Sequence, residues 1–490
     1  MVQIYSYIKP LNTSALDLFC AKIKSFSYAA AFYEKDKHPF EALFSQIEGT
    51  NNLLEIRAYE SRGTNTQRAV NPRRAFGLGM CIKASRADTW KFNYHHEADV
   101  QPFSKGAKVC NAGSVLVGFV PQAFLYQAFN SEEEAGVVVP TYVLWEHAGV
   151  CYVALNSTQK LQGSEVESLL EELCKTSSKE ALPYNRANNQ KGYKTKEGCN
   201  LEQEIKTQGK EAYLSLVERA KQSLEQGLQQ KIVCARKVTL NCGSSPDPEA
   251  LIKTLVSRET PGTLIVRKQD SSLWYALSPE LLVDQSGNTL RTMALAGTYC
   301  ANARREQGMQ LDSKTREEHM LVVEDIRSKL QPFVEKESLK QSGKPLAMNL
   351  GTLRHACTPL TAISNSLTEE TAGQGQLFQR VCQALHPTAA LGGYPSKEAL
   401  EFLHLNEGFN RALFGGYCAL LGCGLGAEES CSMNRANVVL RCFCTEGSLV
   451  SFYAGCGIVK ASDALEELEE SSAKMWSVAR LVEDCIVEEC

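Results

Sequence analysis

The sequence predicts an α+β fold. Short apolar runs rich in β-branched and aromatic residues, bounded by Gly, Asn and Pro, are typical of strands. These runs come in blocks, and helical patterns fall between the blocks instead of alternating with single strands. That order disfavours a doubly wound parallel sheet. No internal repeat at a fixed period is visible.

The composition is that of an ordinary globular protein. Of the 490 residues, 43% are hydrophobic and 22% are charged, and the net charge is -4. This balance gives no broad electrostatic reason to expect a nucleic acid or an anionic membrane as partner. No stretch approaches the roughly 18 apolar residues of a membrane-spanning helix, and the first ten residues lack the features of a signal peptide. We therefore expect a cytoplasmic protein.

The 19 cysteines are odd in number and scattered along the chain, and no Cys-x-x-Cys pair occurs. A zinc ribbon or a thioredoxin-type site therefore has little support. Buried, reduced thiols fit the pattern best, and they agree with a cytoplasmic location.

The first part of the chain predicts strands but no chemical site. Runs at Ser114–Val120, Tyr142–Trp145 and Val150–Leu155 are strand-like. His95–Glu97 could suggest a metal cluster, but neighbouring residues of a strand point to opposite faces, so we expect a solvated loop or strand edge. The polar stretch Lys175–Asn200 is the best candidate for a linker or long loop.

The second part has clearer periodicity. Between Glu211 and Gln229, apolar residues recur three or four positions apart, which predicts a helix, and Asp247 with Pro248 opens another. The expected helices are Glu211–Gln229, Pro246–Val256, Lys314–Leu330 and Ala464–Val482, and the expected strands are Lys231–Leu240, Thr263–Arg267, Leu273–Leu277 and Thr289–Met293.

Two helices carry carboxylates that could bind a metal. Glu467, Glu470 and Lys474 share one helical face, although taken alone a solvated acidic face with an ion pair between Glu470 and Lys474 explains them better. Glu318 and His319 stand near the start of another helix, where acidic residues also favour a helix N-terminus. One Glu from each helix would offer the hard oxygen ligands that suit Mg²⁺.

Several other residues are chemically unusual for their positions. Lys231 begins an apolar strand and Glu280 ends another, so a dry site could make them a base and an acid; solvated strand ends are the alternative. Arg441 stands within an apolar strand and needs a partner, either a carboxylate or a structural one. Gly455 and Gly457 would allow a ligand close to the backbone, or form a simple bulge.

Taken in order along the chain, these residues belong to motifs that resemble the chorismate-binding enzyme family, which includes isochorismate, salicylate, anthranilate and aminodeoxychorismate synthases. The resemblance covers most of residues 201–490, which we expect to be the catalytic region, whereas residues 1–200 would be a variable N-terminal part. The motifs are Lys231–Arg236, Ser278–Leu282, Ala294–Thr298, Arg316–His319, His355–Pro359, His386–Leu391, Phe409–Gly416, Ala454–Val459 and Glu467–Lys474.

The resemblance implies large antiparallel sheets flanked by helices, with Mg²⁺ and chorismate in a central cleft. It makes Lys231 the base that activates water for attack at C2, and Glu280 the acid that protonates the departing C4 hydroxyl. Glu318 and Glu470 would hold the metal, with Glu467 beside them. The residues expected at the substrate are Thr298, His355, Ala390, Arg441, Gly455, Gly457 and Lys474.

Within the family, the motifs favour an isochorismate synthase, an isomerase of the hydroxymutase type. Ala296 occupies the place of the nucleophilic lysine of some aminodeoxychorismate synthases, and the loop around Ala390 resembles that of isochorismate synthases. No obligatory glutaminase subunit is then expected. Menaquinone biosynthesis is the favoured pathway, because no fused lyase or carrier domain is recognised.

Two alternatives remain open. A salicylate synthase would form isochorismate and then eliminate pyruvate, and a non-catalytic relative would act as a binding subunit. A dinucleotide oxidoreductase is disfavoured because Lys460 stands where the third fingerprint glycine should be. Three departures from the family pattern, Leu277, Asn410 and Ala419, could lower activity, and Asn410 could cost a carboxylate partner for the neighbouring arginine.

Overall fold

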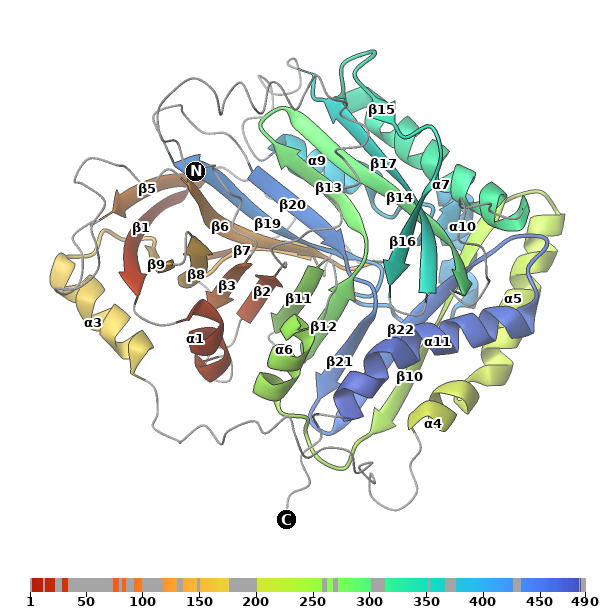
Figure 1. The fold of residues 1–490 in the computed structure, drawn as a ribbon, viewed down its shortest axis with the longest axis horizontal. Coiled ribbons are helices and arrows are strands. Elements are labelled where there is room, and N and C mark those ends of the chain that lie inside the picture. The colour runs from red at the N-terminus through yellow and green to blue at the C-terminus, as the bar shows by residue number, and fades with distance from the viewer. Residues whose placement is uncertain are drawn as a thin grey trace.

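The chain forms two large β-sheets with helices packed around them, as the computed structural model shows (Figure 1). The α+β class expected from the sequence is confirmed. The structure describes residues 2–11, 14–22, 29–33, 74–78, 82–84, 92–98, 118–129, 135–147, 150–175, 201–257, 262–267, 272–300, 313–350, 353–365, 376–425, 433–483 and 485.

The larger sheet has 12 strands, and strands from both parts of the chain build it. Neighbouring strands are antiparallel except β1 and β5, which are parallel. In hydrogen-bonded order the strands are β18 (Gly393–Tyr394), β10 (Lys231–Asn241), β22 (Leu449–Ile458), β21 (Cys442–Glu446), β12 (Leu273–Ser278), β11 (Gly262–Arg267), β2 (Ala29–Tyr33), β3 (Arg74–Leu78), β8 (Tyr142–His147), β9 (Val150–Ser157), β1 (Val2–Leu11) and β5 (Phe92–Ala98).

The second sheet has 10 strands and is antiparallel among its described pairs. It also joins the two parts of the chain, because β19 pairs with β6. The strands are β15 (Lys340–Gln341), β17 (Leu353–Ile363), β14 (Thr289–Cys300), β13 (Leu281–Ser286), β20 (Met433–Val438), β19 (Tyr417–Leu425), β6 (Gly118–Gln127), β7 (Ala135–Val139) and β4 (Ile82–Ala84), with β16 (Leu346–Leu350) paired to β17.

Helices cover the sheets, and α5 and α11 lie along β10 and β22 (Figure 1). The α5 stripe of Leu216, Val217, Ala220 and Leu224 is buried, as its spacing predicts. The helices are α1 (Ala15–Lys22), α3 (Gly163–Cys174), α4 (Leu201–Thr207), α5 (Lys210–Glu225), α6 (Pro248–Ser257), α7 (Ser313–Leu330), the short η3 (Gln331–Phe333), α9 (Gln376–Leu385), α10 (Ser396–Asn406) and α11 (Ala464–Glu483).

All four helices and four strands expected in the second part of the chain are present, with ends shifted by a few residues. The exception is β14, which runs seven residues further than expected, to Cys300. In the first part, the run Ser114–Val120 is described only from Gly118, where β6 begins, and the candidate linker lies outside the described residues beyond Lys175. His95–Glu97 lies on β5, the strand at the end of its sheet, as expected.

The two sheets pack on each other through an apolar cluster that includes Trp274 and Tyr453 from the larger sheet and Leu420 from the smaller one. Tyr453 stacks on Trp274 at 5.0 Å between ring centroids. This packing leaves room for a cavity beside the cluster. The described cysteines are all free and mostly buried, as the sequence predicts. Among the described helices, none combines the length and apolar character needed to cross a membrane.

Candidate functional site

A cavity of about 310 Å³ lies where the two sheets, α7 and α11 meet. Its size falls in the range of small-molecule sites, about 300–1,000 Å³. Every catalytic, metal and substrate residue implied by the resemblance lines it except Thr298. Thr298 lies on β14 directly opposite His355 of β17, next to an irregularity in the strand pairing. The fold therefore brings together residues separated by up to 243 positions.

Lys231 and Glu318 form an ion pair at the cavity wall. Lys231 Nζ lies 2.9 Å from Glu318 Oε1, and the lysine side chain is only 1% exposed. Lys231 is the first residue of β10, as expected, and Glu318 projects from the second turn of α7. A buried ammonium group needs such a partner, because desolvation of an isolated charge is costly.

Glu280 lies between β12 and β13 and is 2% exposed. Its Oε1 accepts no hydrogen bond from the described residues. Burial raises the pKa of Glu280 to about 8, and the lowering effects of Lys231 and the Thr388 hydroxyl offset only part of this shift. The carboxyl group is therefore protonated near neutral pH and able to donate a proton into the cavity.

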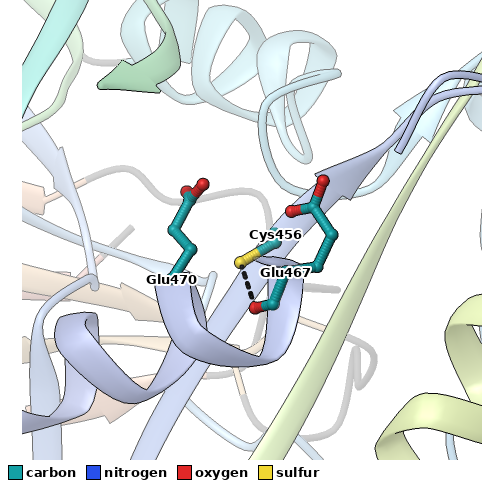
Figure 2. A group of neighbouring side chains, drawn as sticks. All are labelled: Cys456, Glu467 and Glu470. Carbon is teal, nitrogen blue, oxygen red and sulfur yellow. Dashed lines mark hydrogen bonds between the residues drawn. The ribbon is translucent and has the colours of Figure 1, made fainter. Parts of the chain in front are cut away.

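The first turns of α11 present the acidic face expected from the sequence. Figure 2 shows the Glu467 and Glu470 carboxylates pointing the same way, with the Cys456 sulfur between them. Glu467 is only 3% exposed, and Glu470 Oε1 lies 2.6 Å from Lys474 Nζ. The i,i+4 ion pair is thus confirmed, but its surroundings are a cavity wall and not open solvent.

The structure gathers oxygen ligands suited to a hard cation. One oxygen each of Glu467 and Glu470 and the Cys456 sulfur lie within 4.8 Å of one another. The Cys456 thiol donates a hydrogen bond to the Glu467 carbonyl oxygen, and burial raises its pKa well above the ordinary value, so it stays a neutral thiol. Glu467, Glu470 and Glu318 are three of the five carboxyl groups that line the cavity, and their oxygens are of the kind that fits Mg²⁺.

Arg441 provides a cationic group opposite the carboxylates. Its Nη2 donates to His355 Nε2 at 3.1 Å and its Nη1 to Ser477 Oγ at 3.2 Å. Burial lowers the pKa of Arg441 to about 10, so the guanidinium stays charged near neutrality. Burial and the charge of Arg441 hold the pKa of His355 well below its usual value, so its ring is neutral and accepts this bond.

The position expected for Arg441, inside an apolar strand, is wrong. It stands at a bend between β20 and β21 with φ of 49°, a left-handed conformation that is uncommon for residues other than glycine. This bend turns the side chain toward the cavity, and the Arg441 carbonyl accepts from the Leu277 amide at 3.1 Å.

Gly455 and Gly457 lie within β22, where the pairing with β10 continues without a bulge. They pair with Ala235 and Val233 of β10, respectively. A Cβ atom at Gly457 would overlap the Glu318 carboxylate and the stem of Lys231, so only glycine lets the strand approach this ion pair. Lys474 Nζ donates to the Gly455 carbonyl at 2.9 Å, which fixes the lysine beside the strand.

His319, named beside Glu318 as a possible metal residue, has a structural place. Both His319 ring nitrogens are occupied, Nδ1 with the Ala296 carbonyl at 3.2 Å and Nε2 with the Thr358 hydroxyl at 2.7 Å. Burial lowers the pKa of His319 to about 4, and it does not line the cavity, so its proposed metal role is wrong. His386 packs edge-on against Phe129 and Tyr417.

The loop after His386 brings Ala390 to the cavity. Asp325 of α7 anchors this loop, because its Oδ2 accepts from the Ala389 amide at 2.9 Å and from Lys329 at 2.9 Å. Lys329 also donates to the Pro387 carbonyl at 2.8 Å. The loop is thus fixed to the helix that carries Glu318.

The presence of Asn410 does not leave the neighbouring arginine without a carboxylate partner. The neighbouring Arg411 forms a two-pronged ion pair with Glu407, with both N–O distances 2.6 Å. Asn410 itself accepts from the Ala412 amide in a turn. Arg411 also lines the cavity, a position that no local pattern of the sequence indicated.

The other two departures lie in the packed interior. Leu277 is buried in β12, within the cluster under α6, and Ala419 is buried in β19 between β6 and β20. Neither residue lines the cavity. Neither substitution therefore removes a chemical group from the cavity.

Comparison with known proteins places these features in a family. The sequence profile described as "Chorismate binding enzyme" matches residues 41–483. The "Salicylate biosynthesis isochorismate synthase" of Pseudomonas aeruginosa is 32% identical over 265 residues, covering 53% of this chain and 52% of that protein. The "Isochorismate synthase MenF" of Bacillus subtilis is 28% identical over 273 residues, 54% of each chain. The chain thus matches about half the length of these relatives.

A solved structure resembles the whole chain in fold. It is described as MenF, the menaquinone-specific isochorismate synthase from Escherichia coli. The TM-score is 0.65 at 19% identity, and the likeness covers 98% of this chain and 95% of the other. Similarity at this level concerns the fold.

Proposed function

The chain belongs to the chorismate-binding enzyme family, and on this premise we propose that it is an isochorismate synthase, an isomerase that converts chorismate into isochorismate. One observation carries the proposal. A single cavity holds a buried lysine, Lys231, together with a buried carboxyl group, Glu280, that is protonated near neutral pH. A base and an acid in one dry site are what a paired addition and loss of water requires.

In the proposed reaction, Lys231 reacts as the neutral amine, after its ammonium group has released a proton to solvent and left the ion pair with Glu318. It takes a proton from a water molecule as the water oxygen forms a bond to C2 of chorismate. The ring double bonds shift, the bond from C4 to its hydroxyl oxygen breaks, and Glu280 protonates the departing hydroxyl, which leaves as water. One water is gained and one lost, so the product is an isomer of the substrate. Each positioned proton transfer contributes about 10²–10⁴-fold to the rate.

The remaining cavity residues would hold the substrate. Arg441 and Lys474 provide the positive charges that suit its carboxylates, and the Gly455 and Gly457 backbone allows close approach. His355 orients the Arg441 guanidinium through their 3.1 Å hydrogen bond. We assign Thr298 and Ala390 to the same substrate site, because the first lies opposite His355 and the second lines the cavity.

We propose Mg²⁺ as the cofactor, held by Glu318 and Glu470 with Glu467 beside them. Carboxylate oxygens from two helices at one cavity fit this hard cation. When bound, Mg²⁺ would supply positive charge that neutralises the substrate dianion. In the structure Glu318 pairs with Lys231 and Glu470 with Lys474, and each carboxylate would exchange this contact for the cation.

Water is favoured as the nucleophile over ammonia. Ala296 lines the cavity at the position where a covalent amination route would need lysine. We therefore expect no obligatory glutaminase partner. Both curated relatives described above carry the name isochorismate synthase, which supports this choice over a salicylate synthase or a non-catalytic subunit.

We also propose that residues 201–490 carry the catalytic groups and residues 1–200 complete the two sheets. All described residues lining the cavity come from position 231 onward, whereas β6 and β2 extend the sheets. The free cysteines support a cytoplasmic enzyme. Two of the similar proteins carry the name MenF, which supports menaquinone biosynthesis as the pathway that uses the isochorismate. Complementation of a strain that lacks its own isochorismate synthase would test this.

The direct test is to incubate the purified protein with chorismate and Mg²⁺, with and without an ammonium salt, and to separate the products by chromatography. We expect isochorismate without ammonium, reaching the same equilibrium from either side. Salicylate with pyruvate would favour the synthase that continues to elimination. An aminated product formed only with ammonium, or no turnover, would refute the proposal.

A further inference from the structure

The strand that carries Lys231 lies near the end of the larger sheet, where its outer neighbour is very short. β18 has two residues and pairs only with Lys231 and Ile232. The Val233 amide still donates a hydrogen bond to the Gly392 carbonyl at 3.1 Å. Beyond that point, no described strand covers this side of β10.

Two side chains continue the hydrogen bonding that a longer strand would provide. Arg411 Nη2 donates to the Val233 carbonyl at 2.7 Å, and Glu407 Oε1 accepts from the Ala235 amide at 2.9 Å. Unpaired backbone groups at such a buried edge would be costly. The Glu407–Arg411 pair therefore acts as a substitute edge strand.

The same pair joins two parts of the cavity wall and packs on a ring outside it. Arg411 Nη1 donates to the Leu391 carbonyl at 3.0 Å, which ties the loop containing Ala390 to β10. The guanidinium also lies 4.1 Å from the centre of the Phe129 ring, just beyond β6. Both charged side chains are nearly fully buried, with 1% and 3% exposed. Such a network holds its members in one arrangement.

We propose that Glu407 and Arg411 are positioning residues that set the distance between the base Lys231 and the loop facing the substrate. This inference rests on the proposed function. The Val233 carbonyl accepts a hydrogen bond from Arg411, and Val233 is two residues from Lys231 on the same face of β10. Leu391, the other acceptor, directly follows Ala390. A misplacement of about 1 Å in such a wall can cost about 10²-fold in rate.

The chain offers a matched control on the same strand. Arg236 is also buried, and it donates to Ser471, Ser472 and the carbonyls of Ile205 and Gln208. It does not line the cavity. Arg236→Lys therefore removes a comparable buried guanidinium network without touching the cavity wall.

The test compares Arg411→Lys and Arg236→Lys for thermal stability, kcat and KM with chorismate. Lysine keeps the charge but lacks the planar fork that reaches Glu407, Leu391 and Val233 together. We expect both variants to lose stability, and kcat to fall about 10–100-fold only in Arg411→Lys. Glu407→Gln keeps an acceptor for the Ala235 amide but removes the charge and the acceptor for Arg411 Nε, so its kcat should also fall.

Hydrogen exchange provides a readout that does not depend on turnover. In Arg411→Lys, the amides of residues 233–235 and 391–393 should exchange at least about tenfold faster than in the wild type, because the network that closes this edge is broken. In Arg236→Lys they should stay protected. If wild-type protein had no activity on chorismate, the proposed function would fail while this exchange result could still stand.

The inference would be overturned if kcat fell equally in both lysine variants, in proportion to their loss of stability. It would also be overturned if Arg411→Lys kept full kcat, or if its amides at the edge of β10 stayed protected.

Discussion

Replacement of Glu280 by glutamine tests the most unusual ionisation state in the cavity. The carboxyl group is buried, its Oε1 accepts no hydrogen bond from the described residues, and its pKa is raised from 4.5 to about 8. Glutamine keeps nearly the same shape but neither titrates nor donates an acidic proton. Glu280→Gln therefore removes the titrating proton while leaving the packing nearly unchanged.

The magnitude follows from linkage between ionisation and folding. A carboxyl group with a raised folded pKa contributes stability that is fully present below its unfolded pKa, and that contribution is lost as the pH rises through the folded pKa. The window here runs from 4.5 to about 8. At about 1.4 kcal/mol per pH unit, ionisation would cost at most about 5 kcal/mol, and entry of water beside the charged group would reduce this figure.

The assay is urea unfolding of wild type and Glu280→Gln at pH 5, 7 and 9. We expect the stability of the variant relative to wild type to rise with pH, by up to about 4 kcal/mol between pH 5 and 9. Glu401→Gln, at an exposed position of α10, should show no such trend. In turnover with chorismate, wild-type kcat should fall above about pH 8. Glu280→Gln should be slower than wild type by about 10²–10⁴-fold below that pH, and the difference should narrow above it.

A flat stability difference between pH 5 and 9 would show that Glu280 is not held protonated by burial. Turnover by Glu280→Gln at the wild-type rate would show that the departing hydroxyl obtains its proton elsewhere. Either result would refute the reasoning that assigns the acid.

Three further variants probe the ion pair of Lys231 and Glu318 and the glycine beside it. Lys231→Ala should lower kcat by at least about 10²-fold while calorimetry still detects Mg²⁺-dependent binding of chorismate; full activity would mean that another group activates water. Glu318→Gln should raise the Mg²⁺ concentration needed for half-maximal rate, and an unchanged titration would argue against its metal role. Gly457→Ala should push the Glu318 carboxylate away from Lys231 and reduce kcat at least about tenfold with little change in melting temperature, since the overlap involves side chains and not backbone. A variant with normal kcat would show that this ion pair has room to move.

The sequence could predict those parts of the fold that rest on local pattern. The apolar patterns of α5, α7, α11 and β10 each extend over ten or more residues. Patterns of this length determine the type of element locally, so distant contacts did not change it. Arg441 shows the limit of this approach. Its neighbours read as one continuous strand, yet a bend with positive φ separates β20 from β21, and only the packing of the bend reveals it.

The site was predictable to the extent that motifs carried it. Lys231, Glu280 and the α11 carboxylates were found by their type and place in the chain. The roles of Glu407 and Arg411 at β10 were missed, because the acceptor at Val233 lies 178 residues from Arg411 in the sequence. The protonation of Glu280 likewise depends on burial by distant segments, which no local pattern reports.

The place of β22 in the larger sheet has a consequence for synthesis of the protein. β22 lies between β10 and β21, and it is made more than 200 residues after β10. Until it emerges from the ribosome, β10 has an open edge of apolar residues, which is a site for mispairing with other nascent chains. We therefore expect yield to depend on chaperones that shield this edge, and chains arrested before residue 449 to aggregate instead of binding substrate.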